Sequence, residues 1–198
     1  MGQELLKYID RGDRMNFFEL LIEEHNNIKR VLKVTRKLSI KVMETGQVDF
    51  ESFRKIIDFL RNYADKHHHS KEEEILFEKM SKELGEPMAS GPITAMFSEH
   101  DLGRLFIHNL ENALDKVKNG DNEAKVDIVA NAVAYTDLLK RHIEKEDHTI
   151  YRFGENNLKE GSIVKIQKEI NQIEEKASKQ DIQTKYLEII NQLENKVE

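Results

Sequence analysis

Apolar residues recur at helical spacing in four segments of the chain. The pattern predicts helices over residues 16–44, 49–84, 93–118 and 121–153. Glycine and proline disrupt a helix interior, and the connections between these segments contain Gly46, Gly85, Pro87, Gly91, Pro92 and Gly120. Because helices joined by short connections pack antiparallel, we expect an all-α, up-down-up-down four-helix bundle.

The chain divides into three parts on this pattern. We expect residues 1–15 to form an N-terminal arm or short helix, 16–154 to form the bundle, and 155–198 to form an amphipathic helical extension. In the extension, isoleucines such as Ile163 and Ile166 recur three or four residues apart. An isolated amphipathic helix needs an apolar partner surface. The extension is therefore expected to cover the bundle or to pair two copies as a homodimer.

The composition agrees with long helices and narrows the functional classes. The 198 residues include only 9 Gly and 2 Pro, with 34% charged and 38% hydrophobic side chains. There is no Cys, which excludes disulfides, thiolate ligands and iron–sulfur clusters and leads us to expect a cytoplasmic location. The net charge is -6 with basic residues spread along the chain, and no long apolar stretch is present. Neither nucleic acid nor a membrane is an expected partner.

The sequence also contains an internal repeat. The Glu-His pair at 24–25 recurs at 99–100, and the stretch 68–77 recurs as 142–151. Two similar helical hairpins would give the bundle an approximate two-fold axis. Such an arrangement brings one histidine from each helix to a similar depth around that axis: His25, His68, His100 and His142.

Two helices carry a His and a Glu four residues apart, His68 with Glu72 and His142 with Glu146. At ~3.6 residues per turn each pair shares one helix face, and that face continues an apolar stripe. A buried carboxylate costs several kcal/mol unless it is paired or bound to a metal. Imidazole and carboxylate ligands suit iron, with manganese or zinc as alternatives. Because six protein ligands exceed what one ordinary site uses, we predict two ions that share the carboxylates.

Over about residues 16–153, these motifs resemble the hemerythrin family with its HHE motif. The resemblance implies two non-heme iron ions, oxo- or hydroxo-bridged, held by four histidines and two bridging carboxylates: His25, His68, Glu72, His100, His142 and Glu146. Oxygen-carrying members place a second histidine one turn after the ligand on the third helix. Here that position is Arg104, so this chain departs from the oxygen-carrier pattern.

Other ligand sets remain open at this stage. Three consecutive helical positions fan over ~200°, so we expect His67 and His69 to be exposed, although either would serve as a fifth imidazole in another register. A shifted register would also pair His69 with Glu73, or His142 with Asp147. The symmetric set of four histidines and two glutamates is the one we favour.

The resemblance implies a binding protein whose iron pair takes O2, NO or iron itself for sensing, storage or transport. The alternative is a di-iron enzyme that turns over peroxide or NO, or repairs iron centres under oxidative or nitrosative stress. Repair proteins of the family carry a cysteine-bearing segment, and the absence of Cys disfavours that role. A metal-free helical adaptor would have to explain two carboxylates in its core.

Overall fold

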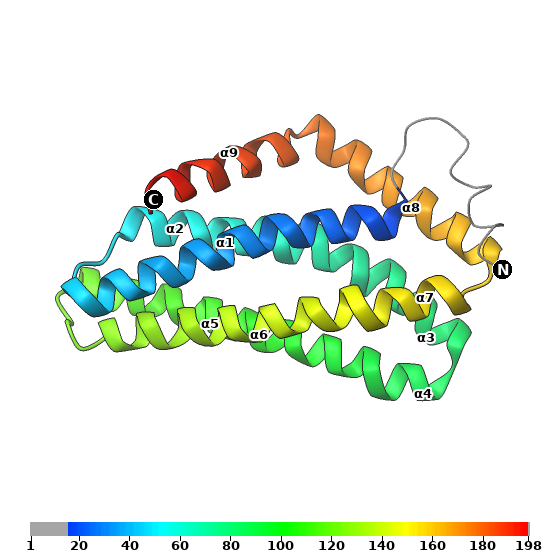
Figure 1. Cartoon of the computed structure of the whole chain (residues 1–198), viewed down its shortest axis with the longest axis horizontal. Helices are drawn as coiled ribbons and strands as arrows, with labels where there is room; N and C mark the ends of the chain where they lie inside the picture. Colours follow the sequence, from blue (N-terminus) through cyan, green and yellow to red (C-terminus); the bar gives the residue numbers. More distant parts are fainter. Residues whose placement is uncertain (1–15, 198) are drawn as a thin grey trace.

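The computed structural model describes residues 16–197, and every regular element in that range is helical (Figure 1). The first arm of the bundle is α1 (Phe17–Thr45), and the second consists of α2 (Phe50–Phe59), the π-helical segments η2 (Leu60–His69) and η3 (Glu72–Phe77), and α3 (Glu78–Leu84). The third arm consists of α4 (Glu86–Met88), η4 (Ala89–Ile93) and α5 (Thr94–Lys118), and the fourth of α6 (Lys125–Lys145), η5 (Glu146–Ile150) and α7 (Tyr151–Asn157). Successive arms run in opposite directions, which confirms the predicted all-α four-helix bundle. The arm expected at residues 1–15 lies outside the described range.

Local capping fixes the first hairpin. The Asn16 side chain caps the start of α1, and the Glu19 carboxylate accepts a hydrogen bond from the Asn16 backbone N–H. Gly46 ends α1 with a left-handed φ of 67°, a conformation that costs glycine nothing. The Asp49 side chain then accepts a hydrogen bond from Ser52 N (3.0 Å) and starts α2. These caps reverse the chain within a few residues.

The connection between the second and third arms is more helical than the sequence suggests. We expected the third helix to begin near residue 93, whereas the chain is helical again from Glu86. Gly85, with φ 83°, makes the turn, and Pro87 occupies the first helical turn, where its missing N–H costs no hydrogen bond. Pro92 lies within π-helical η4, so it interrupts the regular hydrogen-bond pattern without ending the arm.

Two apolar clusters fill the bundle, one toward each end. On α1 the first cluster ends at Leu21 and the second begins at Ile28. On the second arm, which runs in the opposite direction, the second cluster ends at Ala64 and the first cluster begins at Leu76. Between the clusters lies a belt of buried polar side chains contributed by all four arms. We call this layer the polar belt.

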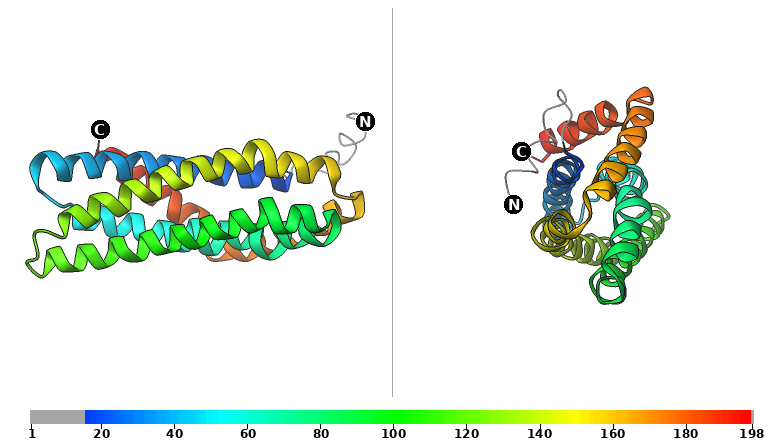
Figure 2. Two further views of the ribbon diagram at one scale, coloured as in Figure 1. Left: turned by 90° about the horizontal axis from the view of Figure 1, so that it is seen from below. Right: turned by 90° about the vertical axis from the view of Figure 1, so that its right-hand side faces the viewer.

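The extension forms two helices, α8 (Glu160–Lys179) and α9 (Ile182–Asn195). They run along the outside of α1 and the second arm (Figures 1 and 2). Ile166 and Ile170 of α8 and Tyr186 and Ile190 of α9 are buried against the bundle. The additional C-terminal helices are thus confirmed, and their apolar face is covered by the chain itself. Among the described residues, none of the helices has the length and apolar character needed to cross a membrane.

Candidate metal centre

Each arm contributes one buried histidine to the polar belt. His25 comes from α1, His68 from η2, His100 from α5 and His142 from α6. They form two pairs in which the Nε2 atoms face each other: His25 and His68 at 2.8 Å, and His100 and His142 at 2.8 Å. The structure therefore brings together all four histidines that the sequence selects.

Glu72 and Glu146 lie between the two pairs, and both are 0% exposed. Oε2 of Glu72 lies 3.6 Å from Nε2 of His68 and 3.7 Å from Nε2 of His100. Oxygen atoms of Glu146 lie 3.3 Å from Nε2 of His25 and 3.7 Å from Nε2 of His100. Each carboxylate thus faces a histidine of both pairs, the position that a bridging ligand requires.

The two glutamates also share a backbone irregularity. Glu72 is the first residue of η3 and Glu146 the first residue of η5, both π-helical. A π-helical turn contains an extra residue and therefore alters which side chains face the interior, and such turns are frequent at functional sites. The repeat in the sequence is therefore also a repeat in backbone geometry.

Every histidine of the two pairs has a carboxylate at its second ring nitrogen. The partners of Nδ1 are Asp147 for His25 (2.6 Å), Glu24 for His68 (2.8 Å), Glu73 for His100 (2.6 Å) and Glu99 for His142 (3.0 Å). An ionised carboxylate only accepts hydrogen bonds, so Nδ1 donates, and Nε2 of the neutral ring is left with a free lone pair. Metal-binding histidines are oriented by partners of this kind.

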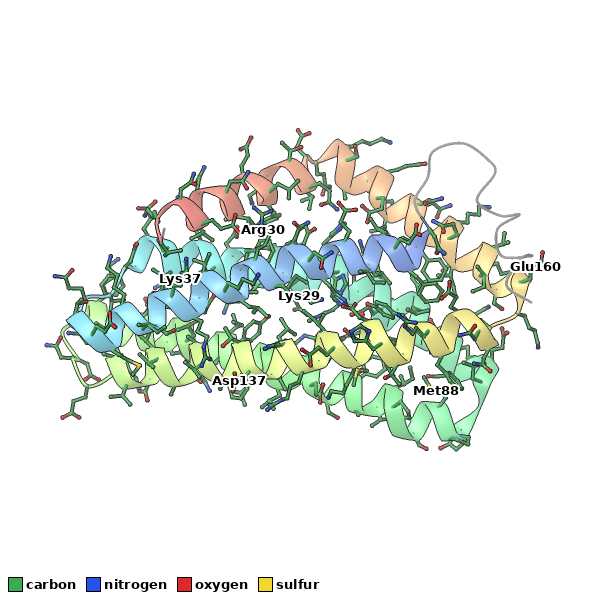
Figure 3. All side chains as sticks on the ribbon, in the orientation of Figure 1. Lys29, Arg30, Lys37, Met88, Asp137 and Glu160 are labelled. Carbon is green, nitrogen blue, oxygen red and sulfur yellow. The ribbon has the colours of Figure 1, made fainter. Side chains whose placement is uncertain are left out.

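A cation lies behind each of these outer carboxylates. Lys29 Nζ donates to Asp147 (2.8 Å), Arg104 to Glu73 (2.7 Å), Lys71 to Glu24 and Lys145 to Glu99. Figure 3 shows Lys29 on the side of α1 that faces the fourth arm. Lys29 follows His25 by one turn, as Arg104 follows His100. Arg104 therefore replaces the second histidine of oxygen carriers with a group that holds an outer carboxylate.

The polar belt needs positive charge at its centre. Within each pair, two Nε2 lone pairs face each other, and Oε2 of Glu72 and both oxygens of Glu146 make no hydrogen bond within the described residues. Protons or metal ions would supply that charge. For metal–nitrogen bonds of about 2.1 Å, two adjacent ligand nitrogens lie about 3.0 Å apart at a 90° angle and about 3.4 Å apart at a tetrahedral angle. The Nε2 separation of 2.8 Å in each pair is slightly shorter than these values, so a small outward shift of the rings would let the residues fit a metal centre.

The pKa shifts of the inner residues are consistent with a requirement for positive charge at the centre of the polar belt. Burial and the nearby Glu146 charge raise the pKa of Glu72 well above its usual value. Burial opposes ionisation of Glu146 as well, but the surrounding imidazoles, His142 foremost, hold its pKa well below the ordinary value. Burial and the neighbouring His25 lower the pKa of His68 to about 4, which keeps this ring neutral as a metal ligand requires.

Tyr151 is a site residue that the sequence analysis did not select. Its buried hydroxyl donates a hydrogen bond to Oε1 of Glu72 and lies 3.5 Å from Nε2 of His25. The corresponding residue in the first hairpin is Phe77. The Phe-to-Tyr difference at this pair of equivalent positions is the sequence signal that would have identified it.

The expectation that His67 and His69 are exposed was wrong, since they are only 7% and 6% exposed. Nε2 of His67 lies 3.0 Å from Oε1 of Glu24 and 3.4 Å from Oε1 of Glu174, which belongs to α8. These three groups could surround an ion. However, Lys71 Nζ contacts all three, so an ammonium group already supplies the positive charge there.

His69 lies on the opposite side of η2, with its ring stacked on His100. A cavity of about 230 Å³ is lined by both histidines and by Gly103, Arg104 and Tyr135. A Cβ atom at Gly103 would lie 3.4 Å from Cε2 of Tyr135, an ordinary contact distance, so Gly103 packs directly against the Tyr135 ring of α6. The cavity gives a small molecule a route to the His100 side of the belt.

The comparisons with known proteins agree with the fold and the site. The chain matches the family model described as hemerythrin HHE cation binding domain over residues 16–153. That range contains all four arms up to α7, together with the whole polar belt. The chain therefore belongs to the hemerythrin HHE cation-binding domain family. Searches of curated proteins and of solved structures found no match.

Proposed function

We propose that the polar belt holds two non-heme iron ions and that this iron pair binds O2 or NO for sensing, storage or transport. The observation that carries the proposal is the pairing of free Nε2 atoms around two buried carboxylates without hydrogen-bond partners at three of their oxygens. An apolar core would not retain such an arrangement without compensating cations. Manganese and zinc are the alternative metals.

The residues divide into ligands and supports. His25 and His68 would hold one ion and His100 and His142 the other, while Glu72 and Glu146 would bridge them. The outer carboxylates at the Nδ1 atoms fix the orientation of the rings and keep Nε2 available. Iron in such a site supplies a change of oxidation state and open positions for a diatomic ligand.

Anaerobic loading with Fe²⁺ tests this proposal. Elemental analysis of wild type is expected to give two irons per chain, and the optical spectrum is expected to change on exposure to O2 or NO. A His68→Ala, His142→Ala double variant should lose both the metal and the spectral change. His108→Ala is the matched control, because His108 is exposed and its ring forms a hydrogen bond with the Asn112 side chain, outside the polar belt. Wild type that takes up no iron, or a double variant that retains two ions, would contradict the proposal.

The Tyr151 hydroxyl favours one alternative, the disproportionation of hydrogen peroxide. The phenol lies beside Glu72 and His25 and could exchange protons as two peroxide molecules become O2 and two waters. An oxygen electrode separates the two functions. Sustained O2 release from added peroxide, reduced in Tyr151→Phe, would indicate the enzyme, whereas a ligand spectrum that reverses under vacuum without turnover would indicate the binder.

A further inference from the structure

The two hairpins differ three residues after the histidine of the Glu-His pair. On α1 this position is Ile28, which is 1% exposed and belongs to the second apolar cluster. On α5 the corresponding residue is Gly103. Outside its own helix, a Cβ atom at Gly103 would have only the Tyr135 ring within 4 Å. Space that a side chain fills in the first hairpin is therefore open in the second, where Gly103 lines the cavity of about 230 Å³.

The size and the walls of this cavity suit a small organic molecule. The cavity is lined by residues of η2, α5 and α6, and its apolar walls include Leu60, Ile107 and Leu139. An apolar cavity of about 150 Å³ is large enough to hold a benzene ring. The volume beside Gly103 therefore accommodates one ring with a small substituent.

Tyr135 provides an unused hydrogen-bond donor at this cavity. The residue is 4% exposed, and its hydroxyl forms no hydrogen bond with another residue of the described range 16–197. Burial and the charge of Asp65, which also lines the cavity, raise the pKa of Tyr135, so the hydroxyl keeps its proton. Buried hydroxyls usually have a hydrogen-bond partner. A ligand with an acceptor atom would supply the partner that the protein leaves out.

The charged side chains around the cavity indicate that such a ligand is uncharged. Lys66 is exposed, so water already solvates its ammonium group. The other ionised groups are held in ion pairs, which a charged ligand would have to break. The pairs are Arg61 with Glu111 (2.6 Å), Arg104 with Asp65 (2.7 Å) and Lys145 with Glu99.

We propose that this cavity is a binding site for an uncharged, single-ring organic molecule whose acceptor atom, such as a carbonyl oxygen, receives a hydrogen bond from the Tyr135 hydroxyl. The ring would occupy the space beside Gly103, between the apolar walls. This site goes beyond the proposed function, since it requires no metal in the polar belt. Because the cavity also leads to His100, an occupant would close that route to other small molecules.

Fluorine NMR titration of the full-length protein tests the proposal with three probes of the same ring size. The probes are 4-fluoroacetophenone, which is uncharged and carries a carbonyl acceptor, 4-fluorotoluene, which lacks the carbonyl, and 4-fluorobenzoate, which is charged. The ketone is expected to bind at one site, ~2–10-fold more tightly than 4-fluorotoluene, as one added hydrogen bond implies. The carboxylate should bind more weakly than the ketone.

Two variants assign the binding to this cavity. Tyr135→Phe should lower the affinity for the ketone by ~2–10-fold and leave that for 4-fluorotoluene unchanged. Gly103→Ile introduces the residue of the first hairpin and should abolish binding of both uncharged probes. Tyr186→Phe, whose hydroxyl bonds to Asp58, should behave as wild type. Circular dichroism checks that each variant is folded, and the Tyr135→Phe comparison stands on its own if Gly103→Ile does not fold.

Three results would overturn the inference. They are the absence of saturable ketone binding to wild type, an unchanged ketone affinity in folded Tyr135→Phe, and tighter binding of 4-fluorobenzoate than of the ketone. The titration is carried out before and after iron loading. Ketone binding to protein that takes up no iron would support this site while contradicting the proposed function, so the two can fail separately.

Discussion

The two helical hairpins of the bundle carry the same inner groups in different surroundings. In both, a Glu-His pair on one helix faces a His and a Glu four residues apart on the next. The carboxylate and cation behind each imidazole are repeated as well, with Lys29 matched by Arg104 and Lys71 by Lys145. The repeat therefore specifies a two-fold set of inner side chains together with the outer carboxylates and cations behind them.

The surroundings break this symmetry in three places. His69 has no counterpart in the second hairpin, and Tyr151 replaces Phe77. Lys71 is 0% exposed because α8 covers it, whereas the side chain of Lys145 is 45% exposed. The two proposed ion positions therefore have different surroundings, although the repeat sets the same inner side chains at both.

The largest effect is expected for Glu72→Gln, which removes one of the two carboxylates that we propose bridge the ions. Iron affinity should fall by at least ~100-fold, while the metal-free protein should gain about 1–3 kcal/mol at pH 7, because Gln is neutral and needs no proton to be buried beside Glu146, as Glu72 does. Iron titration and urea unfolding in the presence of a chelator measure the two effects. Glu144→Gln, at an exposed position of α6, is the control. A variant that keeps two irons, or that is strongly destabilised without metal, would contradict the assigned role.

The buried and exposed lysines provide a second test of the comparison between hairpins. Lys71→Met should destabilise the protein by about 3–5 kcal/mol, since it leaves the Glu24 charge buried without its ammonium partner. Lys145→Met should cost only about 0–1 kcal/mol, because solvent screens the exposed pair with Glu99. Urea unfolding of both variants gives the difference directly. Equal costs would mean that α8 does not isolate Lys71 from solvent.

Metal affinity should fall as the pH is lowered. The pKa of Glu72 is raised. Burial alone would lower the pKa of His25, but the Asp147 and Glu146 carboxylates raise it above its ordinary value. Both groups must lose their protons before a metal binds, so protons compete increasingly as the pH falls through these raised values. Below the pKa of each group, the affinity should fall up to tenfold per pH unit for every proton that metal binding displaces. Calorimetry in buffers of different ionisation enthalpy should detect the released protons, and an affinity independent of pH would contradict this account.

The smallest effect is expected at Tyr151. Tyr151→Phe removes the hydrogen bond to Glu72 and should weaken the ion at His25 and His68 by ~10-fold, leaving the other ion unchanged. Tyr186→Phe is a suitable control, because its hydroxyl bonds to Asp58 of α2, which is not one of the six inner residues. Separate Co²⁺ affinities for the two positions give the result. An equal loss at both ions would mean that Tyr151 does not distinguish them.

The sequence predicted the fold and the burial of the six inner residues because both depend on local periodicity, whereas the role of these residues as ligands stays a prediction. Helical spacing of apolar residues located the arms, and the i, i+4 pairs placed His68 with Glu72 and His142 with Glu146 on interior faces. The exposure of His69 was predicted incorrectly because a regular helical wheel does not apply to η2, which is π-helical. The burial of Lys71 depends on α8, which is distant in the sequence and therefore invisible to local patterns.

The most direct test of the central claim is a crystal structure of the iron-loaded protein with anomalous diffraction measured on both sides of the iron absorption edge. The account predicts two anomalous peaks, one beside His25 and His68 and one beside His100 and His142, with both bridging glutamates between them. A single peak, or iron bound instead at the cluster of Glu24, His67 and Glu174, would contradict it.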